Sequence, residues 1–98
     1  MKEYLVRTSD AHDWPSFATD LAAVFVQPGS GCAPIDGWGD FRMRRSAAEV
    51  SFSGEEVGWQ VSIEGPMDDA TVGALLAQIT ERVGEASGQA CEWIQISW

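Results

Sequence analysis

Apolar residues recur along this chain at two different spacings, and the changes between them mark the expected elements. Residues 2–8, KEYLVRT, place Tyr4 and Val6 on one face and Leu5 on the opposite face. A period of two residues is typical of a β-strand, and the β-branched and aromatic content favours the same structure. The pattern therefore predicts a first strand that is buried mainly on one side.

The next segment changes to helical spacing. A capping carboxylate at Asp13 and a proline at position 15 precede apolar residues spaced three and four apart up to Phe25, as at the start of a helix. We therefore expect a helix over about residues 14–25. The following residues 27–39, QPGSGCAPIDGWG, contain four Gly and two Pro. Since these residues interrupt both periods, we expect a long surface loop there.

Period-two alternation returns at residue 41. Residues 41–52 predict two strands with a turn at residues 45–47. The polar stretch 53–58 separates them from a third alternating run, residues 59–63. Two alternating runs around a short polar stretch predict a β-hairpin. The pair Gly65-Pro66 should end its second strand, because it breaks the period and removes a backbone donor.

The last third of the chain predicts a second helix and a final strand. Asp68 and Asp69 supply an N-cap and a first-turn carboxylate, and an apolar stripe in residues 72–83 predicts the buried face of the helix. Gly88 is a natural C-terminal stop. Residues 91–98, CEWIQISW, then predict a strand with apolar residues on both faces. Such a strand is either central in a sheet or has a face that contacts something else.

This order of elements predicts an α+β fold. We expect a two-layer sandwich in which two helices pack on one face of a four- or five-stranded mixed, mainly antiparallel sheet, ferredoxin-like or related, in the order β-α-β-β-(β)-α-β. The length of 98 residues fits one domain. An apolar content of 45% with five Trp favours a folded core over disorder. We therefore expect residues 1–98 to form a single acidic α+β domain.

The chain is strongly acidic, with 15 Asp and Glu against six Lys and Arg and a formal net charge of −9. Such a charge repels phosphate backbones and anionic lipids and attracts basic surfaces. We therefore expect a basic protein partner, and neither nucleic acid nor a membrane. The alternative is that the carboxylates only keep the protein in solution. The lack of a long apolar run and the acidic residues Glu3 and Asp10 favour a cytoplasmic protein.

Residues suited to catalysis or metal binding are few. His12 stands at the expected helix start, where capping or solvation is a better interpretation than catalysis. Cys32 lies in a glycine-rich loop without a neighbouring base, and Cys91 reads as a core residue. Neither cysteine has a partner at metal-ligand spacing, and Asp36 and Asp40 lack the remaining ligands of a calcium loop. We therefore expect no enzyme activity, metal or cofactor.

The segment Asp36-Gly37-Trp38-Gly39-Asp40 is the best candidate for partner binding. A glycine-flanked Trp can present a large rigid contact surface, with a carboxylate on either side to meet Arg or Lys. The alternative is that Trp38 folds back onto the core. Further carboxylates would extend this segment into an acidic rim if the fold brings them to the same edge: Glu55, Glu56, Asp68 and Asp69.

Two functions are consistent with these features. The first is a small protein-binding module, with an immunity protein or antitoxin that neutralises a basic partner as its concrete form. The second is a homo-oligomeric structural or scaffold domain, for example a homodimer, that buries a sheet face carrying Trp93 and Trp59. Arg42, Arg44 and Arg45 form too small a cluster for nucleic acid binding. We expect them to pair with nearby acids or with the acidic face of a second copy.

Overall fold

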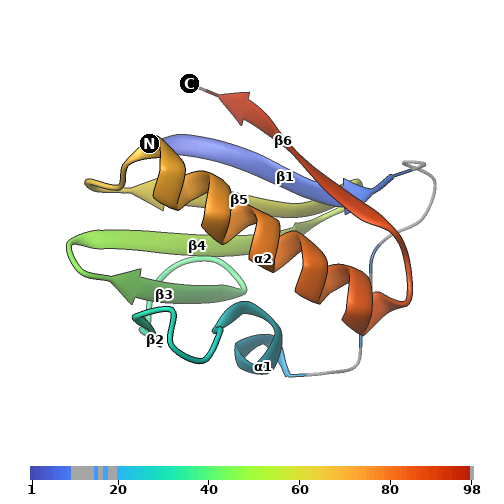
Figure 1. The fold of residues 1–98 in the computed structure, drawn as a ribbon, viewed down its shortest axis with the longest axis horizontal. Helices are drawn as coiled ribbons and strands as arrows, with labels where there is room; N and C mark the ends of the chain where they lie inside the picture. The colour runs from blue at the N-terminus through green and yellow to red at the C-terminus, as the bar shows by residue number, and fades with distance from the viewer. Residues whose placement is uncertain (10–14, 16, 18–19, 98) are drawn as a thin grey trace.

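The chain forms an antiparallel sheet with a long helix lying diagonally across one face (Figure 1). A computed structural model describes residues 1–9, 15, 17 and 20–97. These residues form six strands in the order β2-β3-β4-β5-β1-β6, and each neighbouring pair is antiparallel. The strands are β1 (Lys2–Thr8), β2 (Cys32–Pro34), β3 (Phe41–Arg45), β4 (Ala48–Glu55), β5 (Gly58–Glu64) and β6 (Cys91–Ser97). The helices are α1 (Leu21–Phe25) and α2 (Asp69–Ser87).

The expected two-layer arrangement is wrong in the number and the direction of its strands. The sheet has six strands instead of four or five, its pairs are antiparallel instead of mixed, and the structure is 42% strand and 27% helix. The added strand is β2, inside the segment expected to be a loop, and it pairs with β3 from Cys32 to Pro34. β5 and β6 run in the same direction, but β1 lies between them and pairs antiparallel with both. The connection through α2 therefore creates no parallel pair.

The first helix is shorter than the expected range of about 14–25. Its described helical part is α1, five residues long, and Pro15 and Phe17 are not helical. Residues 14, 16, 18 and 19 of the expected helix lie outside the described residues. Phe25 of α1 is fully buried, and its ring stacks on Phe52 with centroids 4.0 Å apart. Tertiary packing of Phe25 therefore holds this turn, because five residues cannot form a stable helix alone.

The second helix and the core follow the predicted pattern. Asp68 caps α2 by accepting a hydrogen bond from the Thr71 backbone N–H at 2.7 Å, and Gly88 ends it in the left-handed conformation. The whole predicted stripe is buried: Val72, Leu75, Leu76, Ile79 and Val83. It packs against inward-facing side chains of the sheet, which are Tyr4, Val6, Met43, Val50, Phe52, Trp59, Val61 and Ile63.

Both predicted hairpins are confirmed. β3 and β4 are joined through Ser46, which has a positive φ of 54°. β4 and β5 pair out to Glu55 and Gly58, so their tip is the two-residue loop Glu56-Val57. The sheet order and these turns decide which loops meet at each end of the sheet.

Candidate functional site

The strand register brings four of the candidate carboxylates to one end of the sheet. Glu55 and Glu56 lie at the tip between β4 and β5. β3 begins at the same end, because Phe41 pairs with Phe52 of β4, and the preceding loop carries Asp36 and Asp40. All four carboxylates are exposed. We call this group, together with Trp38, the acidic end.

Asp68 and Asp69 lie at the opposite end of the sheet. α2 starts beyond the end of β5, near the start of β1, where Asp69 forms an ion pair with Lys2 at 3.1 Å. The hydrogen bond from the Thr71 backbone lowers the pKa of Asp68, as expected for a capping carboxylate. The seven candidate residues therefore do not share one surface. Asp68 and Asp69 instead stabilise the start of α2.

The loop of residues 35–40 is fixed to the sheet at both ends. The Ile35 N–H donates to the Arg42 carbonyl at 3.0 Å, and the Asp40 N–H donates to the Phe52 carbonyl at 2.8 Å. The Asp40 carboxylate also accepts a hydrogen bond from the Gly54 N–H at 2.6 Å. Gly39 has a φ of +93°, and a side chain there would press on the Phe52 carbonyl oxygen. These hydrogen bonds and the conformation of Gly39 therefore fix the loop, which carries Trp38 between its two anchored ends.

Trp38 lies on the surface, so the alternative that it folds into the core is wrong. Half of its surface is exposed. The guanidinium carbon of Arg42 lies 5.2 Å from the ring centroid, and Gly37 packs so closely on the Arg42 side chain that a Cβ there would clash. A cation over an aromatic face is attracted by the ring quadrupole. The Arg42 guanidinium therefore packs against one face of the Trp38 ring and helps to hold it in place.

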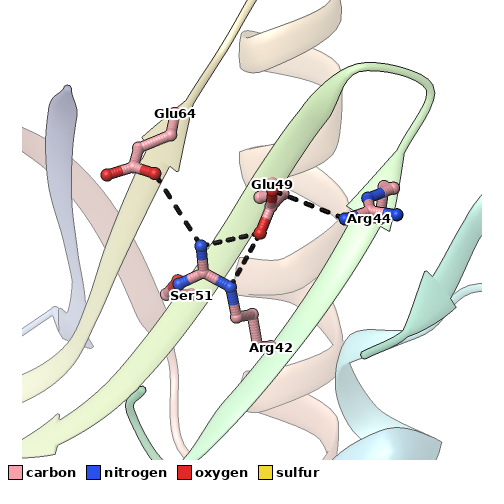
Figure 2. A network of polar contacts seen from close by, with 5 residues as sticks. All are labelled: Arg42, Arg44, Glu49, Ser51 and Glu64. Atoms are coloured by element: carbon pink, nitrogen blue, oxygen red, sulfur yellow. Dashed lines mark hydrogen bonds and ion pairs between the residues drawn. The ribbon is translucent and has the colours of Figure 1, made fainter. Parts of the chain in front are cut away.

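Arg42 is also the centre of a polar network on the sheet face opposite α2 (Figure 2). Its Nε and Nη2 donate to Glu49 Oε1 at 3.0 and 2.7 Å, and its Nη1 donates to Ser51 Oγ at 2.6 Å. Glu64 Oε2 lies 3.8 Å from Nη2, and Arg44 contacts the second oxygen of Glu49 at 3.6 Å. The network therefore joins β3, β4 and β5 and fixes the residue under Trp38.

The predicted pairing of Arg42 and Arg44 with nearby acids is confirmed, and Arg42 is buried. Its hydrogen bonds to Glu49 lower the pKa of that carboxyl. Sequence reasoning missed Glu49 as a partner. The strand register of the β3–β4 hairpin could have identified this partner, because it pairs Arg44 directly with Glu49. Arg45 points to the other face, where it donates to the Ser30 carbonyl at 3.1 Å.

The two tryptophans of the expected oligomer interface differ in exposure. Trp59 lies in the core with 7% of its surface exposed and stacks on Phe17 at 5.7 Å. Trp93 is 37% exposed on β6 and packs edge-on against Tyr4 at 5.8 Å. Only Trp93 is therefore placed to contact a partner, and its burial against a second copy stays a prediction.

The candidate nucleophiles and bases are not brought together in the part of the chain that the structure describes. His12 lies outside the described residues. Cys32 is half-buried in β2 and Cys91 is half-buried in β6, where burial raises the pKa of the Cys91 thiol. The described ranges contain no group of three or more His, Cys, Asp or Glu that could hold a metal ion. None of the described helices is long and apolar enough to cross a membrane.

Comparisons with known proteins give no relative: no family model matches the chain, and no curated protein or solved structure matches it. The geometry of the acidic end is therefore the basis for assigning a function.

Proposed function

We propose that this protein is a small acidic protein-binding module and that its acidic end recognises a basic partner protein. The observation that carries this proposal is the half-exposed Trp38, held over Arg42 in an anchored loop. Aromatic residues are frequent binding hot spots. A side chain that is already ordered loses little entropy on binding.

The charge around Trp38 favours a basic partner. Asp36 and Asp40 flank the indole in sequence, and Glu55 and Glu56 lie at the neighbouring tip. The nearest cation, Arg42, is buried and paired with Glu49, so it adds little positive charge to the surface. Complementary charge raises the rate of encounter, and a buried aromatic residue slows dissociation.

The concrete form of this proposal is an immunity protein or antitoxin that neutralises a basic partner without chemistry of its own. The cytoplasmic location expected from the sequence belongs to the same proposal. Affinity capture at low salt should recover a basic protein, because salt screens attraction between exposed charges. Recovery of only further copies of this chain would contradict the proposal and favour the homo-oligomeric alternative.

Substitutions then test the surface against the captured partner. Trp38→Ala should weaken binding by about 30-fold or more, the effect of losing a hot spot worth about 2 kcal/mol, and should leave cooperative unfolding intact. Glu56→Gln should slow association, whereas Asp69→Asn removes the same charge at the opposite end and serves as its matched control. Equal effects of the two charge variants would show that only net charge matters. Unchanged affinity of Trp38→Ala would exclude the acidic end as the binding site.

A further inference from the structure

The two edges of the sheet differ in how they are protected. β2, at one edge, has three residues and ends in Pro34, features that limit pairing with another strand. β6, at the other edge, has seven residues without Pro, Lys or Arg, and among the described strands it pairs only with β1. Trp93 and Ile96 of β6 are 37% and 42% exposed, and Ile94 alternates with Trp93 onto the other face of the strand. β6 is thus not a central strand, and its two-sided apolar pattern needs another explanation.

The register shows which backbone groups of β6 point away from the sheet. The Ser9 N–H donates to the Ala90 carbonyl at 2.8 Å, in the same register as the regular part of the β1–β6 ladder. In an antiparallel pair, residues with both backbone groups toward the partner alternate with residues that point them away. Because Ala90 points its backbone groups toward β1, the residues of β6 that point their backbone groups away from the sheet are Cys91, Trp93 and Gln95. The irregularity in the ladder begins directly after Gln95, between its partner Tyr4 and Glu3 of β1.

A groove runs along this edge between α2 and β6. It consists of two hollows of about 530 and 320 Å³, both lined by Trp93. Gly73, Ala77 and Gly84 form the wall on the side of α2, and their small size leaves room beside the indole. Gln89 lines the larger hollow, and its buried Oε1 has no hydrogen-bond partner among the described residues. The groove therefore offers apolar surface and an unused acceptor next to the outward backbone groups.

We propose that an extended basic segment of a partner protein adds to β6 as a further strand of the sheet. Its backbone would bond to the outward groups of Cys91, Trp93 and Gln95. Its side chains would lie alternately against Trp93 in the groove and against Ile94 on the other face. Strand addition of this kind obtains affinity from backbone hydrogen bonds and specificity from alternate side chains.

Charge favours a basic segment over a second copy of this chain. A second copy would bring another net charge of −9 to the edge, and like charges oppose association. Glu81 lies exposed at the rim of the larger hollow and can attract Lys or Arg. Three strands separate this edge from β3, which follows the Trp38 loop, so the inference does not rest on the function proposed for Trp38.

Selection of random short peptides by display on the folded full chain tests this proposal. The enriched peptides should alternate apolar residues and carry Lys or Arg. Synthetic copies should bind Gln95→Pro about tenfold more weakly than wild type, because proline removes one outward N–H without removing a bond to β1. The matched control Gln95→Ala keeps this N–H and should lose much less affinity than Gln95→Pro, although it changes a side chain that lines the smaller hollow. Trp38→Ala should bind as wild type, which separates this site from the acidic end.

Three results would overturn the proposal. These are the absence of enriched peptides, equal binding to wild type and Gln95→Pro, and a wild-type dimer that Gln95→Pro dissociates, which would identify a second copy as the occupant. If Gln95→Pro does not fold, hydrogen exchange of wild type replaces it. A selected peptide must then slow exchange at the outward amides of Cys91, Trp93 and Gln95, and unchanged exchange there contradicts strand addition.

Discussion

Gly58 at the start of β5 is the position where adding one methyl group should destabilise the fold most clearly. Its φ is +151°, a conformation that residues with a side chain rarely adopt. A Cβ there would clash with the Val6 carbonyl oxygen and lie 3.2 Å from the Arg7 Cα. Both neighbours belong to the backbone of β1, which is paired on both sides. The clash in Gly58→Ala therefore has no flexible side chain to relieve it.

The magnitude follows from two costs. A residue with a side chain in a sparsely populated backbone region costs about 1–3 kcal/mol, and overpacking against fixed atoms costs about 1–3 kcal/mol. We expect a loss of about 2–6 kcal/mol, a large part of the roughly 5–15 kcal/mol typical of a domain. At about 4–8 °C per kcal/mol for a chain of this size, this loss lowers the melting temperature by at least about 8 °C.

Urea unfolding followed by circular dichroism measures this loss, and Gly73→Ala is the matched control. Gly73 lies inside α2, and a Cβ there would meet no atom within 4 Å. Replacing a helix-interior glycine by alanine should stabilise the protein by about 0.5–1 kcal/mol. The same chemical change should therefore have opposite signs at the two positions. A Gly58→Ala variant as stable as wild type would refute the close approach of β5 to β1.

Two further predictions concern titration and thiol reactivity. Because hydrogen bonds from Arg42 lower the pKa of Glu49, their stabilisation is present above the unfolded carboxyl pKa of about 4.3 and is lost as the pH falls through the lower folded value. Glu49→Gln should thus melt below wild type at neutral pH, with a difference that shrinks in acid; a constant difference would contradict this pairing. Because burial raises the pKa of Cys91, iodoacetamide should modify Cys91 in a Cys32→Ser variant more slowly than in the same variant unfolded by urea. Mass spectrometry measures both rates, and equal rates would place the thiol in solvent.

The elements predicted well are those in which one period continues long enough to be recognised. The stripe of α2 and the alternation of Trp59, Val61 and Ile63 each report a face that is buried along its whole length. β2 escaped prediction because three residues show no period, and its Gly and Pro neighbours indicate a loop. Its strand character comes from backbone pairing with β3, which side-chain pattern does not encode.

The candidate site was predicted in its parts but not in its assembly. The local sequence identified Trp38 and its flanking carboxylates as a recognition segment. It could not identify Arg42 as the residue that packs against the indole, since that contact requires the loop to fold back onto β3. Glu56 precedes β5 and Asp69 follows it, so the predicted strand between them already implies that they lie at opposite ends of the sheet. Local residues thus indicate which side chains can bind, and the strand order decides which of them act together.

The separation of the two proposed surfaces has a consequence for how a partner would bind. β4, β5 and β1 lie between β3, which carries the Trp38 loop, and the open edge of β6. Sites without shared contacts contribute nearly additive free energies. If both proposals hold, a partner with a basic surface and an extended basic segment engages both, and the first contact raises the effective concentration for the second. Trp38→Ala and Gln95→Pro together should then weaken the binding of that partner by the product of their separate factors. A double variant no weaker than the worse single variant would show that both substitutions act on one contact.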